Sequence, residues 1–352
     1  MKFVLGCLLL FVAQVQAFCP LSQAEPVKVR IHHQQQVTYA SVNLVTADDA
    51  KQRLELVKEH GPLLTSFDLS DIAADIRVLA KPLAEDWNLD GIADHLWLLG
   101  IDGRLWRLSI SDGLFGIPRL MADLSDSGLF FGSTIALIRA RLPRHLAPAS
   151  WRSVDHHQLL LVGTEPLSGK DVLFNLRFDA LLKLQYLLNS QHLLDRTLLS
   201  EPELKQQFSA ADWRTILSAA GWKVSLPGRI SSMPKVIAGV IYAPVVTSEG
   251  FGICHANQTE QLLFAFQLYT ATQVYRQRSW KIPVLDNAVL KIREQPDKTL
   301  ALVLQDETHY ISLLDGLLKI SHECHQCTAP LTLDRFPLWQ RLATYRDERG
   351  AF

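Results

Sequence analysis

The stretch DWNLDGIADHLWLLGIDGRLWRLSI, residues Asp86–Ile110, carries the clearest structural signal in the chain. Its first nine residues place oxygen atoms at alternate positions. A hard cation such as Ca²⁺ takes six to eight oxygen ligands, and a tight loop can supply them from positions 1, 3, 5, 7 and 9. The sequence therefore predicts a calcium site formed by the side chains of Asp86, Asn88, Asp90 and Asp94 and the backbone carbonyl of Ile92.

The residues around these ligands indicate what kind of loop this is. Gly91 occupies position 6, where the chain must turn sharply. Position 12 is Trp97 and not the bidentate Glu of an EF-hand, so the EF-hand is excluded. Two apolar segments follow with Asp102-Gly103 between them, which predicts a β-hairpin. We expect a structural calcium loop whose metal binding is coupled to folding of the hairpin; the alternative is an ordinary solvated acidic turn.

Two tryptophans lie on the predicted hairpin. Trp97 and Trp106 stand on its two strands. Large aromatic side chains on paired strands stabilise most where they are buried between layers. We expect them to pack between neighbouring sheets, and a ligand-binding platform is the alternative.

The rest of the chain reads as many short strands. Apolar or alternating segments recur at near-regular spacing, at residues 27–32, 37–45, 156–164, 221–228, 232–246 and 260–278, and a three-strand meander covers 288–314. This predicts an all-β, β-propeller-like fold with an open blade number, and a sandwich is the alternative. No internal repeat is visible.

Helices are expected at two places. Residues 200–221 form the best helical segment, with Ser200 and Ser209 as N-caps and Gly221 as a C-cap. A capping-box pattern at 46–49, followed by Gly61-Pro62, also predicts a short helix over residues 50–60.

The N-terminus has the pattern of a secretory signal peptide. Lys2 precedes an apolar core, and Val15-Gln16-Ala17 resembles a cleavage site. We expect a signal peptide over residues 1–17, one propeller-like domain over 18–352, and a periplasmic or exported protein. No later segment has the roughly 18 apolar residues of a membrane span. The formal net charge of −1, without a basic stripe, argues against nucleic acid as a partner.

Several other motifs admit a chemical interpretation. Cys19, Cys254, Cys324 and Cys327 follow the predicted cleavage site, and disulfide use with undetermined pairing is favoured over a zinc site that includes His322 and His325. The segment 163–170 departs from the P-loop pattern and predicts a turn between strands. The pairs His32-His33 and His156-His157 lack a matched nucleophile or carboxylate and are interpreted as ordinary strand histidines.

Four segments together resemble a known family. The loop and hairpin of Asp86–Arg107 look like the calcium-binding blade in the C-terminal propeller of PilY-type proteins, which are type IV pilus biogenesis factors and tip adhesins. GWKVSLPGRISSMPKVIAGVIYAPVV (221–246) and SEGFGICHANQTEQLLFAFQLYTATQ (248–273) are similar to later parts of the same region, as is LLDRTLL (193–199). The resemblance covers roughly residues 65–280. The chain lacks the family's large N-terminal region, its early blades are degenerate, and HECHQCTAPL replaces the Gly-rich ending.

The resemblance implies a calcium-stabilised propeller in type IV pilus assembly, pilus-tip adhesion or twitching motility. It implies pilins or minor pilins as partners, no enzymatic activity, and a location in the periplasm, at the cell surface or at the pilus tip. One alternative is a periplasmic quinoprotein-like enzyme, although repeated tryptophan docking motifs and adjacent cysteines are missing. A scaffold of another envelope complex is the other alternative.

Overall fold

The structure is a computed structural model of the 352-residue chain. It describes residues 26–47, 51–73, 75–140, 156–177, 187–204, 208–248, 258–285, 288–319 and 345–348. The predicted signal peptide and all the cysteines lie outside these residues.

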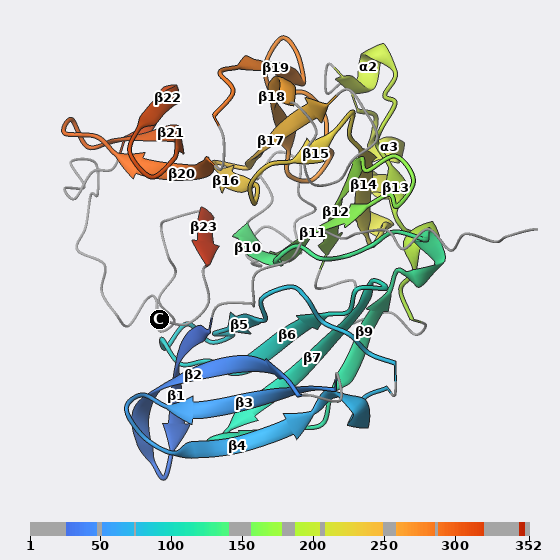
Figure 1. Cartoon of the computed structure of the whole chain (residues 1–352). Helices are drawn as coiled ribbons and strands as arrows, with labels where there is room; N and C mark the ends of the chain where they lie inside the picture. Colours follow the sequence, from blue (N-terminus) through green and yellow to red (C-terminus); the bar gives the residue numbers. More distant parts are fainter. Residues whose placement is uncertain are drawn as a thin grey trace, which may run out of the picture.

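The described residues form five antiparallel-rich sheets that follow one another along the chain (Figure 1). Sheet one contains β1 (Val27–His33), β2 (Gln36–Thr46), β3 (Gln52–Lys58) and β4 (Leu63–Asp68). Sheet two contains β5 (Leu83–Glu85), β6 (His95–Leu99), β7 (Arg104–Ser111), β8 (Leu114–Phe115) and β9 (Arg119–Asp123). Sheet three contains β10 (Ala136–Ala140), β11 (His156–Thr164), β12 (Asp171–Arg177), β13 (Leu194–Asp195), β14 (Gly221–Ser225) and β23 (Tyr345–Glu348).

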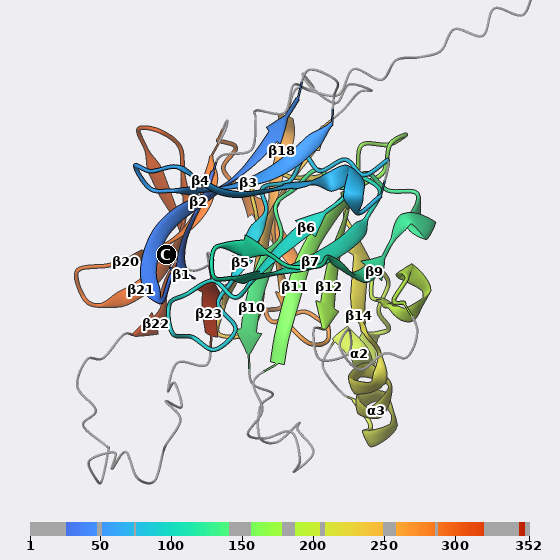
Figure 2. The ribbon, with the colours of Figure 1, turned by 90° about the horizontal axis from the view of Figure 1, so that it is seen from below.

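The last two sheets complete the series. Sheet four contains β15 (Arg229–Ile230), β16 (Lys235–Ile237), β17 (Val240–Ser248), β18 (Gln258–Gln267) and β19 (Ser279–Ile282). Sheet five is the meander β20 (Val289–Glu294), β21 (Thr299–Gln305) and β22 (Tyr310–Lys319). None of these sheets closes on itself. In the view from below, the strands of the different sheets run in different directions (Figure 2).

Each pair of consecutive sheets shares a hydrophobic core. Leu56 and Leu98 lie in the core between sheets one and two, and Trp97 and Leu159 lie in the next core. Sheets three and four share a core that contains Trp222, while sheets four and five share a separate one. Full burial of one leucine contributes about 1.5–3 kcal/mol. The shared cores therefore stabilise the packing of each sheet on the next. The all-β fold predicted from the strand pattern is confirmed.

The inner sheets are buried on both faces, which explains their uninterrupted apolar runs. In β11, Leu159 and Leu161 point to the core with sheet two, whereas Leu160 and Val162 point to the core with sheet four. A strand covered on both faces does not need to alternate apolar with polar residues. The segment 163–170 is a turn between β11 and β12, as predicted.

The short helix predicted for residues 50–60 is wrong, because this segment contains β3. Leu54 and Leu56 are fully buried, while Arg53 and Glu55 alternate with them on the other face. This period of two places one face against sheet two. Gln52 is also buried, and its side-chain amide bonds both the backbone N–H and the carbonyl of Val78.

The helical insertion is confirmed in part. It consists of α2 (Glu201–Leu204) and α3 (Ala210–Ser218). Ser209 caps α3 as predicted, with its hydroxyl accepting from the Asp212 N–H and the Asp212 side chain accepting from the Ser209 N–H. Gly221 is not the C-cap: α3 ends at Ser218 with Ala219 as the cap, and Gly221 begins β14.

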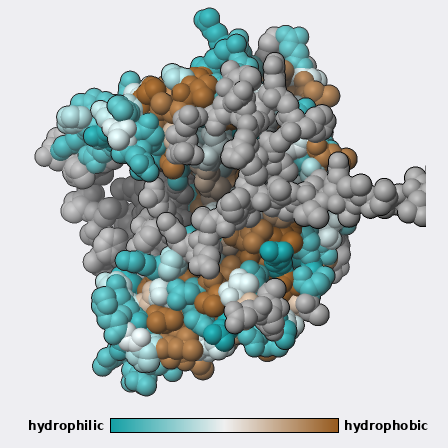
Figure 3. Space-filling view, in the orientation of Figure 1, coloured by the Kyte–Doolittle hydropathy of each residue, from teal (hydrophilic) through white to brown (hydrophobic). Residues whose placement is uncertain are grey.

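The surface in the orientation of Figure 1 mixes hydrophilic with smaller hydrophobic areas (Figure 3). In the part of the chain that the structure describes, no helix is long and apolar enough to cross a membrane.

Candidate calcium loop and the buried cluster beside it

The predicted calcium loop connects β5 to β6. These strands pair antiparallel, with Glu85 opposite His95, and the nine residues between them form the loop. The Asp94 N–H donates to the Glu85 carbonyl at 2.8 Å and closes its neck. β6 then pairs with β7 through the turn at Gly103, whose φ is +86°, so the predicted hairpin is confirmed.

Hydrogen bonds within the loop fix its backbone. The two carboxylate oxygens of Asp86 accept from the N–H groups of Leu89 at 2.6 Å and Gly91 at 2.8 Å. Asp90 accepts from the Ile92 N–H at 2.8 Å and from the Asn88 amide at 3.0 Å. Such side-chain-to-backbone turns are what Asp and Asn favour, and they draw the loop into a tight coil.

A left-handed backbone completes the tight loop. Gly91 has φ +85°, as expected from its position 6, and Leu89 has φ +66°. The Asp94 carboxylate accepts from the Trp87 N–H at 2.7 Å and so folds the end of the loop back on its beginning. The structure therefore brings the four predicted side chains into one hydrogen-bonded loop.

The donor set fits a hard cation in its chemistry. All predicted ligand atoms are oxygens, which are the ligands that Ca²⁺ takes. Within the described residues, however, no group of three or more His, Cys, Asp or Glu side chains is arranged to hold a metal ion. Calcium binding would therefore require the three carboxylates to turn toward a common point.

A buried polar cluster lies at the neck of the loop. The Glu85 side chain is 0% exposed, and its Oε2 accepts from the Trp97 indole N–H at 3.0 Å and from Arg107 at 3.0–3.1 Å. Its Oε1 has no hydrogen-bond partner among the described residues and lies 3.9 Å from Nδ1 of His157. His157 belongs to β11, so this cluster joins sheet two to sheet three.

Burial sets the ionisation of this cluster. It raises the pKa of Glu85 above its usual value, while Arg107 and the Trp97 indole N–H oppose that shift. Burial, and then the charge of Arg107, lower the pKa of His95 to about 4. His95 is therefore a neutral imidazole near neutral pH.

The two hairpin tryptophans pack between sheets, as expected. Trp97 is fully buried in the core shared by sheets two and three. Trp106, on the adjacent strand, packs against the core shared by sheets one and two. The hairpin therefore anchors sheet two on both of its faces.

Four further residues belong to this region although the sequence pattern does not predict it: Glu85, Arg107, His157 and the buried Arg139 of β10. The sequence alone favours an ordinary strand histidine at position 157. A signal was present: a charged residue inside an apolar strand, as in the ALIRA of β10, is rarely buried without a partner. The partner comes from another sheet, so the spacing along the chain does not reveal it.

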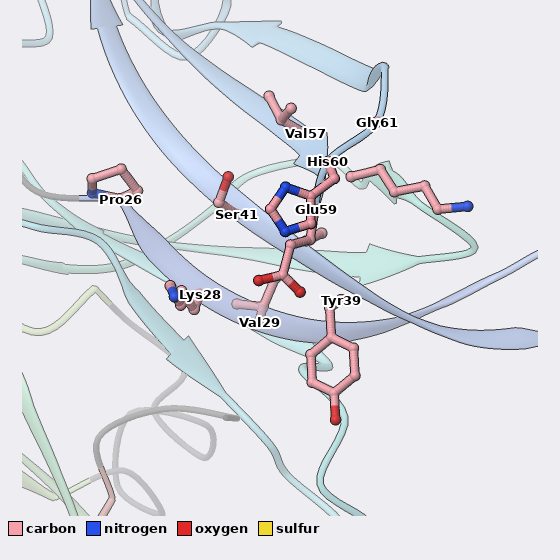
Figure 4. Close-up of a pocket in the computed structure, with 11 residues that line it drawn as sticks. Pro26, Lys28, Val29, Tyr39, Ser41, Val57, Glu59, His60 and Gly61 are labelled. Carbon is pink, nitrogen blue, oxygen red and sulfur yellow. The ribbon is translucent and has the colours of Figure 1, made fainter.

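A groove lies on the outer face of sheet one (Figure 4). Its cavity volume is about 650 Å³. Lys28, Ser41 and Val57 form a row across three neighbouring strands, and Tyr39, 57% exposed, stands beside Glu59. The groove carries both signs of charge and includes none of the predicted calcium ligands.

Comparison with known proteins finds a solved structure of similar fold but no similar sequence. No protein-family model matches the chain, and no curated protein sequence matches it. Among solved structures, the chain is similar to the C-terminal domain of Pseudomonas aeruginosa PilY1, with a TM-score of 0.54 and 14% sequence identity. The similarity covers 82% of this chain and 71% of that domain. The family resemblance seen in the sequence is thus matched in three dimensions, and the chain has the propeller-like fold of the PilY1 C-terminal domain.

Proposed function

We propose that this protein is an exported, calcium-binding, propeller-like factor that acts in type IV pilus assembly, pilus-tip adhesion or twitching motility, without catalysing a reaction. The observation that carries the proposal is the shared fold with the PilY1 C-terminal domain over 82% of the chain. Pilins or minor pilins are the partners that this role requires.

The calcium part of the proposal depends on the loop between β5 and β6. Its ligands would be Asp86, Asn88, Asp90, Asp94 and the carbonyl of Ile92, and the three carboxylates would turn from their present hydrogen bonds toward a common point to bind the ion. Three acidic side chains in nine residues repel one another, and a bound cation would remove that repulsion. Calcium would therefore stabilise the junction of sheets two and three. The predicted signal peptide at residues 1–17 would deliver the mature domain, residues 18–352, to a calcium-containing compartment.

Thermal melting tests the calcium site. At a calcium concentration about 100 times Kd, binding to the folded state alone stabilises it by about 2.7 kcal/mol, so the melting temperature should rise by several degrees. Asp90→Ala should lose this rise. Asp306→Ala is the matched control, because Asp306 makes similar side-chain-to-backbone bonds in the turn after β21 of sheet five. If calcium does not change the melting temperature of the wild-type protein, the proposed calcium site is contradicted.

The same variants test the pilus role in the strain that encodes the protein. Deletion should reduce surface piliation and twitching, and the wild-type gene and Asp306→Ala should restore both. Asp90→Ala should restore them poorly. Normal piliation and twitching in the deletion strain would refute the pilus role and leave the calcium measurement unaffected.

A further inference from the structure

The loop between β5 and β6 is held from both sides by the neighbouring sheets. On one side, the Ala93 N–H donates to the carbonyl of Arg30 in β1 at 2.7 Å. The Arg30 guanidinium lies against Gly91, where an added Cβ would come within 2.9 Å of Nη1. On the other side the contact is made by Arg139 of β10.

Arg139 binds the backbone of the loop at its first predicted ligand. Its Nη2 donates to the carbonyl of Asp86 and, at 3.1 Å, to the carbonyl of Trp87. The residue is only 8% exposed, so these bonds are made in a largely desolvated environment, where hydrogen bonds from a charged donor are strong. Arg139 thereby fixes the backbone from which the Asp86 carboxylate projects.

A second contact supports the first. His157 lies opposite Arg139 in the register of β10 and β11. Its ring meets the ring of Trp87 edge-on, with 4.7 Å between the centroids. Sheet three therefore contacts both Asp86 and Trp87 through two neighbouring side chains.

We propose that Arg139 is a positioning residue for the calcium loop, and that it couples occupancy of the loop to the docking of sheet three on sheet two. This inference rests on the proposed calcium function. Arg139 has two opposite effects on a cation: its bonds orient the Asp86 ligand, while its positive charge repels the metal. Its bonds to the carbonyls of Asp86 and Trp87 leave the Asp86 carboxylate to the loop's own N–H groups. If the orienting effect is the larger one, removal of Arg139 weakens calcium binding even though it removes a positive charge.

The test compares calcium affinity in the wild type, Arg139→Lys and Arg139→Gln. Calorimetric titration gives Kd, and terbium luminescence excited through Trp87, which is 43% exposed, reports metal in the loop directly. Replacement of a residue that orients a metal ligand costs about 10- to 100-fold in metal affinity. Arg139→Gln should show a loss of that size and Arg139→Lys a smaller one, because both bonds come from the single Nη2 atom, whose place a lysine ammonium can take in part.

Arg177→Gln is the matched control. Arg177 lies in β12 of the same sheet, is 7% exposed, and likewise donates to two carbonyls, those of Ile216 and Leu217, on the side of α3. Its variant should lose thermal stability without a change in Kd. If the Arg139 variants do not fold, His157→Asn, which leaves Arg139 in place and removes the ring beside Trp87, should show the same direction of change.

The outcomes are distinct. A wild-type protein that binds no calcium overturns the proposed calcium function and this inference with it. A wild-type protein that binds calcium, with an unchanged or tighter Kd in folded Arg139→Gln, overturns the positioning role alone. Equal losses of affinity in Arg177→Gln and Arg139→Gln would also overturn it, because the effect would then be one of general stability.

Discussion

Leu89 and Gly91 both adopt left-handed backbone conformations within three residues of each other. For a leucine this conformation costs about 1–2 kcal/mol, so the loop holds Leu89 in an unfavourable state. Backbone strain persists only where surrounding contacts impose it. Here those contacts are the Asp86 bonds to the N–H groups of both residues, which produce the tight coil around the predicted ligands.

Gly221 shows a second reason why a position requires glycine, which is the lack of space for a Cβ. Its φ is +141°, and a Cβ there would lie 1.9 Å from the carbonyl oxygen of Asn175 on the paired strand β12. Gly221→Ala should therefore destabilise the protein by about 3 kcal/mol or more in urea unfolding, from steric overlap added to strain.

Gly169→Ala is the control that separates steric overlap from backbone strain. Gly169 has φ +69°, yet nothing lies within 4 Å of an added Cβ, so only the strain of about 1 kcal/mol applies. Equal losses of unfolding free energy in both variants would show that overlap with Asn175 has no role.

Residue spacing predicted the loop but not its surroundings. The alternating oxygens, Gly91 and the Asp102-Gly103 turn are adjacent in sequence, so local chemistry determines them. Arg139 lies 53 residues from Asp86, and His157 reaches Glu85 only because β11 pairs with β10. No local pattern contains that information.

At the scale of elements, β3 shows why the predicted helix was wrong. Its sequence contains good helix formers, and Thr46–Asp49 resembles a capping box. The alternation of Arg53 and Glu55 with the buried Leu54 and Leu56 is the stronger signal, since burial against sheet two outweighs a propensity difference of less than 1 kcal/mol per residue. In contrast, α3 has both a cap and an amphipathic pattern, and its prediction is confirmed apart from the C-cap.

The element α2 should make the protein sensitive to acid. The pKa of Glu203 is lowered to about 2 by hydrogen bonds from the Ser200 hydroxyl and N–H and by Arg196 at 2.6 Å. Because its pKa in the unfolded chain is the ordinary value of about 4.5, the stabilisation is complete above pH 4.5 and is lost between pH 4.5 and 2. Glu203→Gln should melt a few degrees lower than the wild type at pH 6.

The two melting curves should converge as the pH falls toward 2. Glu307→Gln, a substitution in the exposed turn after β21, controls for the removal of one negative charge. A wild-type and Glu203→Gln difference that stays constant from pH 6 to pH 2 would rule out this linkage.

The whole molecule is a row of sheets in which each shares a core with its neighbours in the chain. Sheet one meets sheet two, sheet two meets sheet three, and this continues to sheet five. The loop between β5 and β6 adds polar contacts to this apolar series, since it reaches β1 through Arg30 and β10 through Arg139. An ion in the loop would therefore act on three of the five sheets.

Hydrogen–deuterium exchange with and without calcium tests whether an ion in the loop stabilises these three sheets and not the other two. Amides that exchange by local opening should slow in the loop and in β1, β6 and β10, because bound calcium would oppose separation of the elements that hold the loop. The amides of β20–β22 should keep their rates, since sheet five shares its core with sheet four and not with sheet two. Asp90→Ala should show no calcium-dependent change in any strand. Slowing of equal size in all five sheets would instead mean that calcium acts only on global unfolding, and the loop would then stabilise the molecule without linking particular sheets.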